Sequence, residues 1–304
     1  MGESGRLRVA VTIATLADAA RRSDLDRAVT SVLEQRGVEC RAIVVVNGGR
    51  SDPAVMGRLA ARPGVTLVHL PDGDLARARV LGVEQVEEDT FCFLDDDDEL
   101  LPNSVSSRLQ RLLERPAVDI VLGNGVRRGP MGDVRRWTAT PARAAELERD
   151  PLGGLLTANW MGSCSGLFRR ASFPPSFFAD TTAYEWTYWA FRVALFRTPA
   201  FLPEDTYVVH DTPESMSKSS TFLHARLDLL EKLLPLGHYD RRVIEYVRLN
   251  RASAYHELAE HYRARQRRDQ AWHFHLATLC APRGYRHLSF TRHLLFESGL
   301  RRPG

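Results

Sequence analysis

The chain has 304 residues, a formal net charge of +3 and an apolar fraction of 44%. This length predicts one main domain with a helical appendage rather than two full domains, and the apolar fraction is enough to bury a sizeable core. The charge is too small to imply a nucleic-acid partner, and no apolar run approaches the ~20 residues that span a bilayer.

Cysteine usage and the N-terminal segment bear on the compartment. The four cysteines are widely spread, with no paired spacing, at positions 40, 92, 164 and 280. Two of them fall in expected buried strands, so all four are predicted to be reduced. No signal peptide is recognisable before the first expected strand. These features predict a cytoplasmic protein.

The first third of the chain alternates apolar strands with amphipathic helices. Strands are expected at 8–13, 40–46, 66–69 and 90–94. Helices are expected from Ser23, after Pro53 and around 76–86, and Asp26 is the expected capping-box partner of Ser23. Such alternation predicts βαβ units, and hence an α/β fold with a mostly parallel sheet flanked by helices. Ligands of these sheets bind beyond the carboxyl ends of the strands.

Four consecutive aspartates, Asp95 to Asp98, follow the expected strand at 90–94. Adjacent carboxylates repel one another, so folding must offset them with a cation or with hydrogen-bond donors. Residues two apart at a strand end point the same way, so Asp95 and Asp97 are placed to contact one ligand together. Carboxylate oxygens suit Mg²⁺ or Mn²⁺, which also bind diphosphates. The alternative is an acidic turn that caps the helix after Pro102.

Residues 221–304 change in character and predict a helical tail. Leucines 223, 227, 230 and 234 lie at helical spacing, a second helix is expected at 250–265, and Asp269 is expected to cap a third that ends at Pro282. This pattern resembles a single tetratricopeptide-like hairpin, which would pack on the main domain or on a second subunit as a homodimer. Five tail histidines are expected at the surface: His261, His273, His275, His287 and His293. The tail arginines, mixed with aromatic residues, leave a peripheral membrane contact open.

Several short motifs occur in a fixed order along the first half. They are Ala14-Thr15 after the first strand, Ser31 with Gln35, Asn47 with Ser51-Asp52, Ala78-Arg79 with Gly82, and Phe93-Leu94 followed by Asp95–Asp98 and Pro102. Their order and spacing resemble a family 2 glycosyltransferase with the GT-A fold, over roughly residues 7–220. The acidic run resembles the Leu-Asp-x-Asp-Asp motif that holds the metal in this family.

The resemblance implies a domain organisation and a set of donor-side residues. A Rossmann-like GT-A domain would cover 1–220, with a donor half at about 7–125 and an acceptor half at about 126–220, followed by the tail at 221–304. Donor contacts are implied for Ala14, Thr15, Asn47, Arg79, Asp95 and Asp96, and a divalent cation (Mn²⁺ or Mg²⁺) for Asp97 and His210. Ala14, Asn47 and Val80 depart from the family's proline, aspartate and asparagine. An amide both donates and accepts, so the nucleotide base stays open.

The segment Tyr184-Glu185-Trp186-Thr187-Tyr188-Trp189 resembles the family's Glu-Asp-Trp-x-x-Trp segment. The resemblance implies that Glu185 is the catalytic base, which takes the proton of the attacking acceptor. The alternative is a surface glutamate on a helix whose tryptophans are core, with Asp180 as the fallback base. His210 ends an expected short strand, and Ser215-Met216-Ser217 follow it.

The implied activity is a metal-dependent, inverting transfer of the hexosyltransferase type from a nucleotide-diphosphate sugar, favoured as UDP-linked. The acceptor would be a hydroxyl or other nucleophile on a saccharide or natural product, with a peptide or a lipid-linked acceptor left open. A catalytically inactive sugar-nucleotide-binding or scaffold protein is the non-enzyme alternative. A nucleotidyltransferase is disfavoured because residues 14–22 contain no glycine for a phosphate loop. The donor sugar, acceptor, oligomeric state and pathway are not determined by the sequence.

Overall fold

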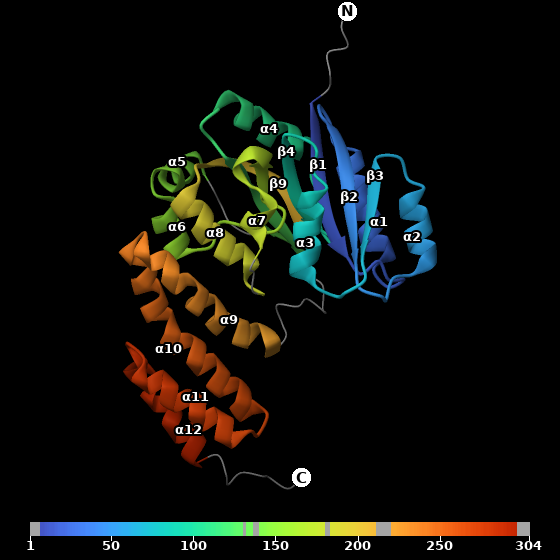
Figure 1. The fold of residues 1–304 in the computed structure, drawn as a ribbon. Helices are drawn as coiled ribbons and strands as arrows, with labels where there is room; N and C mark the ends of the chain where they lie inside the picture. Colours follow the sequence, from blue (N-terminus) through green and yellow to red (C-terminus); the bar gives the residue numbers. More distant parts are fainter. Residues whose placement is uncertain (1–6, 130–131, 136–139, 180–182, 211–219, 297–304) are drawn as a thin grey trace, which may run out of the picture. The chain divides into compact units, whose positions relative to one another are not determined.

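The computed structural model describes residues 7–129, 132–135, 140–179, 183–210 and 220–296 (Figure 1). The chain divides into two compact units. The first comprises residues 1–181 and 185–213, and the second comprises residues 182–184 and 214–304. Each unit is described by itself.

The first unit is built on one mixed sheet. Its strands are β1 (Arg8–Thr15), β2 (Glu39–Asn47), β3 (Val65–Leu70), β4 (Thr90–Asp95), β5 (Glu99–Leu100), β6 (Ile120–Gly129), β7 (Gly132–Arg135), β8 (Gly166–Arg169) and β9 (Pro199–His210). The order across the sheet is β3-β2-β1-β4-β8-β6-β9-β5, and β7 pairs with β6. The strands β3, β2, β1 and β4 are parallel neighbours, as is the pair β6–β9, whereas β8, β5 and β7 pair antiparallel.

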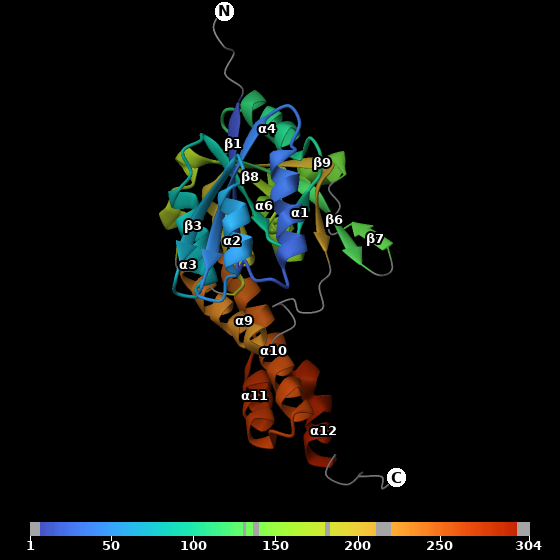
Figure 2. The ribbon, with the colours of Figure 1, turned by 90° about the vertical axis from the view of Figure 1, so that its right-hand side faces the viewer.

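Helices cover both faces of this sheet. They are α1 (Arg22–Leu33), α2 (Pro53–Ala60), α3 (Leu75–Glu84), α4 (Ser104–Glu114), α5 (Pro141–Arg149), α6 (Pro151–Thr157), α7 (Pro175–Phe178) and α8 (Glu185–Phe196), with a 3₁₀ turn η1 (Arg170–Ser172). Figure 2 shows α1 and α2 in front of the sheet, with α3 behind its edge. The predicted α/β fold with a Rossmann-like sheet flanked by helices is confirmed.

The pleat of the strands sorts their side chains into two cores. Cys92 and Leu94 of β4 join the aliphatic core that α1, α2 and α4 cover. Phe91 and Phe93 point to the opposite face, where Phe93 lies 6.0 Å between ring centres from Trp189 of α8. Because side chains alternate along a strand, one continuous apolar run supplies both layers. β4 is thus buried on both faces as far as Leu94, and Asp95 follows at its end.

Helix α1 begins differently from the prediction. Its first residue is Arg22, and the N-cap residue Arg21 makes no side-chain capping bond. Instead the Asp18 carboxylate accepts from the Arg21 backbone N–H at 2.9 Å. The predicted Ser23–Asp26 capping box is therefore wrong, because an Asx-type turn outside the helix supplies the acceptor.

The second unit is helical. It contains α9 (Ser220–Leu233), η3 (Leu234–His238), α10 (Arg241–Ala264), α11 (Arg268–Cys280), η4 (Gly284–Phe290) and α12 (Thr291–Phe296). Tyr262 of α10 stacks on Phe274 of α11 with ring centres 5.5 Å apart, which joins the predicted pair of helices. The tetratricopeptide-like character of this pair stays a prediction.

Three details of the tail differ from expectation. Helix α10 begins at Arg241 rather than near 250, and Asp269 lies in the first turn of α11 rather than at its N-cap, which is Arg267. His275 is fully buried, and its Nε2 lies 2.7 Å from the Thr291 hydroxyl. The prediction that His275 is a surface residue is wrong, because η4 and α12 cover it.

The structure bears on the predictions about the cysteines and about membrane-spanning segments. Cys40, Cys92, Cys164 and Cys280 are all free, as predicted, and the first three are buried. Among the helices of the described segments, none combines the length and apolar character needed to cross a membrane.

Candidate active site

The acidic run lies in the turn between β4 and β5. Asp95 ends β4, Glu99 begins β5, and the Asp98 N–H donates to the Asp95 carbonyl at 3.2 Å. Side-chain exposure alternates along the run: Asp96 and Asp98 are buried, and Asp95 and Asp97 are half-buried. Asp95 and Asp97 are thus the two carboxylates of the run that a ligand at this sheet edge can reach.

Asp96 fastens the acidic run to the turn after β1. Its Oδ2 accepts from the Thr15 hydroxyl at 2.6 Å, and its Oδ1 accepts from Arg21 at 2.7 Å. Burial raises the pKa of Asp96 to about 6, although Thr15 and Arg21 oppose the rise. The structure thus shows Asp96 as a buried link between two loops, and its contact with a donor stays a prediction.

Asp98 fastens the same run to the end of β9. Its Oδ1 accepts from the His210 backbone N–H at 3.0 Å, and the Cys164 thiol lies 3.4 Å from its Oδ2. Burial, together with the neighbouring Asp95 and Asp97, raises the pKa of Asp98 to about 8, although the His210 N–H and the Cys164 thiol oppose the rise. The protein itself therefore supplies donors for the two buried carboxylates.

The His210 imidazole lies beside β5. Its Nε2 is 3.3 Å from Oε1 of Glu99, and Arg128 donates to the same oxygen at 3.1 Å. The antiparallel register pairs Glu99 of β5 with Val208 of β9, and the His210 N–H bonds to Asp98, so His210 lies beside the acidic turn that contains Asp97. Within the described residues, no group of three or more His, Cys, Asp or Glu side chains is arranged to hold a metal ion.

Arg79 joins the acidic run to helix α8. One of its guanidinium nitrogens donates to Asp95 at 3.3 Å, and another pairs with Glu185. The guanidinium carbon lies 5.4 Å from the Trp186 ring centre. Arg79 and Glu185 are both buried, so Glu185 is not the surface residue of the alternative interpretation.

Burial raises the pKa of Glu185 above its ordinary value, while the Arg79 cation lowers it and Asp95 adds to the rise. A carboxylate that is partly desolvated, yet kept in reach of a cation, is a stronger base than one in water and can still ionise. The arrangement of Arg79, Glu185 and Asp95 therefore suits proton transfer next to a binding edge.

The turn after β1 lies at the same edge. Ala14 pairs with Asp95 in the β1–β4 register. Ala17 has φ +50°, its N–H donates to the Thr15 hydroxyl at 3.0 Å, and its carbonyl accepts from the Asp52 N–H at 2.9 Å. A non-glycine residue in the left-handed region is held there only by such surrounding contacts.

Asn47 ends β2 at the neighbouring position of this edge. It is buried, and its Oδ1 accepts from the Asp74 backbone N–H at 2.9 Å. Since a backbone N–H can only donate, this bond fixes the amide with its oxygen toward Asp74 and its NH₂ group on the other side. An aspartate at this position would lack the NH₂ donor that Asn47 offers.

The model of glycosyl transferase family 2 matches residues 18–173, more than half of the chain. The chain belongs to glycosyl transferase family 2. It is therefore a glycosyltransferase, as the ordered motifs predicted.

Solved structures with the same fold include crystal structures of S. aureus TarS. TarS 1–349 in complex with UDP has 14% identity and a TM-score of 0.59, over 97% of this chain and 93% of that one. TarS 1–349 in complex with UDP-GlcNAc has 14% identity and a TM-score of 0.61, over 90% and 82%. At this identity the likeness shows the fold, which confirms the GT-A prediction. None of the curated proteins matches the chain.

Two arginines of this glycosyltransferase were not predicted as part of the site. Arg21 pairs with Asp96, and Arg27 donates to the Asp97 backbone carbonyl at 2.6 Å. The position of Arg21 at the N-cap of α1, and of Arg27 in the next turns, was an available signal, because this helix follows the first strand and begins at the ligand edge. The fallback base Asp180 and the segment Ser215–Ser217 lie outside the described residues.

The Ser31 and Gln35 motif braces the loop after the acidic run. The Ser31 hydroxyl accepts from the Leu100 N–H at 3.0 Å. The Gln35 amide donates to the Leu101 carbonyl at 2.9 Å and accepts from the Val105 N–H at 3.0 Å. This motif thus has a structural role in the glycosyltransferase: it ties helix α1 to the far side of the acidic turn.

Replacing Gln35 with alanine is expected to lower the free energy of unfolding by about 1–3 kcal/mol, because it leaves the buried Val105 N–H without its side-chain acceptor. The Leu101 carbonyl loses one donor and keeps the other, the Ser104 N–H at 3.1 Å. Urea denaturation followed by circular dichroism measures this. Gln110→Ala is the matched control, since Gln110 is exposed on α4 and bonds only to Glu114. Equal stability losses in the two variants would contradict the bracing role.

Proposed function

We propose that this glycosyltransferase moves a sugar from a UDP-linked donor to a hydroxyl or other nucleophile on a saccharide or natural product, with inversion at the anomeric carbon. The observation that supports it most is the bridge made by Arg79, which contacts both Asp95 and Glu185. The buried Arg79 guanidinium thus joins half-buried Asp95, at the sheet edge where ligands bind, to buried Glu185, which is suited to be a base. A donor at Asp95 would place its reacting carbon within reach of an acceptor at Glu185.

The UDP assignment is supported by the fold relatives, since TarS 1–349 is described in complex with UDP and with UDP-GlcNAc. In this chain, Thr15, Asn47 and Asp95 lie at the carboxyl ends of β1, β2 and β4. We assign Asn47 to the base and Asp95 to the ribose. The NH₂ group of Asn47 would donate to a uracil carbonyl, where the family's aspartate can only accept.

The residues at the acidic turn fit a divalent cation. The donor set of Asp97 and His210 combines a hard carboxylate oxygen with a neutral imidazole, as Mn²⁺ accepts, and Mg²⁺ commonly takes one or two carboxylates with substrate phosphates and waters. A site of this kind needs no third protein ligand. When bound, the cation would stabilise the charge of the diphosphate leaving group.

Proton transfer falls to the chain's own residues. Glu185 would accept the proton of the acceptor as its oxygen attacks, and Arg79 would hold that carboxylate ionised and oriented until then. Trp186, next in sequence and close to Arg79, limits water access to the pair. The protein thereby keeps a base of raised pKa in its charged form.

The pH dependence of turnover is expected to report Glu185. Only the ionised carboxylate is a base, so kcat should fall as pH decreases through a pKa above the ordinary glutamate value. Arg79→Gln removes the cation that lowers this pKa, so the acidic limb should move up by about one pH unit or more. The matched control is Arg77→Gln, whose arginine is exposed on the same helix and pairs with Glu84. If the acidic side of the pH profile of kcat lies at the same pH in Arg79→Gln as in the wild type, Glu185 is excluded as the titrating group.

Titration of the full chain with UDP and MnCl₂, combined with an assay of UDP-sugar hydrolysis, tests the proposed donor and metal. The proposal predicts metal-dependent UDP binding together with slow donor hydrolysis. Binding of UDP without any turnover, over a panel of UDP-sugars, would contradict the proposed transfer.

A further inference from the structure

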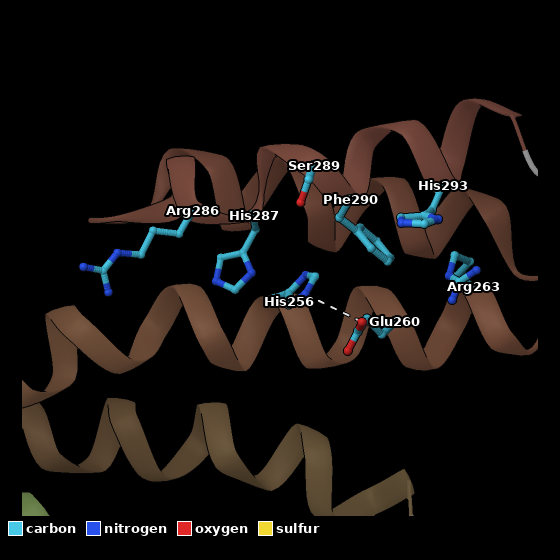
Figure 3. A pocket seen from close by; sticks show the side chains of 8 residues that line it. All are labelled: His256, Glu260, Arg263, Arg286, His287, Ser289, Phe290 and His293. Carbon is cyan, nitrogen blue, oxygen red and sulfur yellow. Dashed lines mark ion pairs between the residues drawn. The ribbon is translucent and has the colours of Figure 1, made fainter.

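A polar pocket lies within the second unit, between α10 and the η4–α12 segment (Figure 3). Its volume is about 260 Å³, below the ~300–1,000 Å³ typical of pockets for drug-sized ligands, so it suits a small ligand. It is lined by His256, Glu260, Arg263, Arg286, His287, Ser289, Phe290 and His293.

The lining is rich in cationic and protonatable groups. Arg263 and Arg286 against Glu260 leave a net charge of +1 with the imidazoles neutral, and the three lining histidines can add three more positive charges. One lining residue, Phe290, is buried and belongs to the hydrophobic core cluster of this unit. The guanidinium carbon of Arg263 lies 5.6 Å from the Phe290 ring centre. Such a lining attracts an anion.

Two imidazoles of the pocket lining lie in contact with each other. The His256 and His287 ring centres are 4.0 Å apart, and Figure 3 shows His287 pointing from η4 toward His256 on α10. The His256 Nε2 lies 3.7 Å from Glu260, and its buried Nδ1 has no hydrogen-bond partner. Two facing imidazoles repel when both are protonated, and a nearby anion offsets that repulsion.

The surroundings of His256 set the direction of its titration. Burial lowers the pKa of His256, and His287 from η4 and His275 from α11 lower it further. Glu260 and Glu257, on the same helix, oppose this, and Arg263 and Arg286 add positive charge to the pocket. A bound anion would raise this pKa, and by linkage its affinity rises as pH falls.

We propose that this pocket binds a phosphoryl group, and that binding is coupled to protonation of the imidazole pair. Donors reach it from two sides, from α10 below and from η4 and α12 above, with the Ser289 hydroxyl among them. A tetrahedral oxyanion with three or more acceptor oxygens satisfies donors on both sides, whereas a carboxylate presents only two oxygens in one plane. The pocket is independent of the proposed sugar transfer.

The test is a titration of the full chain with inorganic phosphate at pH 6.0 without divalent cations, observed through the imidazole carbon–proton NMR signals. The signals of His256 and His287 are expected to shift, while that of His210 in the first unit stays in place. Affinity should be about fivefold weaker at pH 7.5. Phenyl phosphate in place of inorganic phosphate tells whether a phosphate on a larger molecule binds more tightly than the free ion. Benzoate is the carboxylate control.

Arg286→Gln and His287→Gln are expected to weaken phosphate binding about fivefold. Arg286 is exposed, so its replacement leaves the fold intact. Arg292→Gln is the matched control, because Arg292 is an exposed arginine of α12 outside the lining. The proposal is overturned if phosphate moves none of the lining histidine signals, if benzoate binds as tightly, or if Arg292→Gln weakens binding as much as Arg286→Gln.

Discussion

Replacing Glu185 with glutamine is expected to lower kcat by about 10²–10⁴-fold, with UDP-sugar affinity nearly unchanged. The amide keeps the shape of the side chain and can still accept from Arg79, but it cannot take a proton. Arg79 also keeps its contact with Asp95, so the cation is not left without a partner. Single-turnover kinetics with a UDP-sugar and an acceptor, together with UDP titration, measure the two quantities separately.

Two further variants, Glu185→Asp and Asp180→Asn, test whether Glu185 is the base. Glu185→Asp keeps the charge and is expected to retain more activity than Glu185→Gln, because the shortened carboxylate still accepts protons. Thermal denaturation of each variant shows whether loss of activity reflects loss of fold. If Glu185→Gln stays active and Asp180→Asn does not, Asp180 is the base and the role given to Glu185 is wrong.

Replacing Asp97 with asparagine is expected to abolish the dependence of UDP binding on Mn²⁺. Changes around metal ligands typically cost about 10–100-fold in metal affinity, so the loss of a direct ligand should cost at least as much. The fold should survive, since removing one of four crowded carboxylates relieves repulsion. Calorimetric titration with UDP, with and without MnCl₂, measures the effect.

The variants compared with Asp97→Asn replace two other carboxylates by the corresponding amides. Glu114→Gln removes an exposed carboxylate at the end of α4 and should leave metal-dependent binding unchanged. Asp95→Asn is expected to weaken UDP binding less severely, through the ribose. Metal-dependent affinity that persists in Asp97→Asn would place the cation on other residues.

Much of the first unit could be predicted because its local signals agree with its tertiary structure. The apolar run ending at Leu94 becomes β4, and the strand expected at 40–46 lies within β2. Such strands are buried on both faces, so the sequence run and the structure coincide. The start of α10 was missed although its buried residues Val243 and Val247 lie at helical spacing, because arginine and glutamate residues surround them in the sequence.

Contacts between distant segments could not be predicted in the same way. The Arg79–Glu185 pair spans 106 residues and the Asp96–Thr15 bond spans 81. Both form because β1 and β4 are neighbours and α8 packs behind them, which no local pattern encodes. Burial of His275 has the same origin, since a later segment covers it.

The sequence by itself determined the alternation of strands and helices over the first third of the chain, the position of the acidic run at a strand end and the membership of family 2, because each depends on local periodicity or on motif spacing. Only the tertiary structure decided which acids are buried against donors, that Arg79 connects the acidic run to Glu185, and that three tail histidines gather with two arginines in one pocket. Charge pairing and desolvation act through space, so they depend on which distant segments the fold brings together.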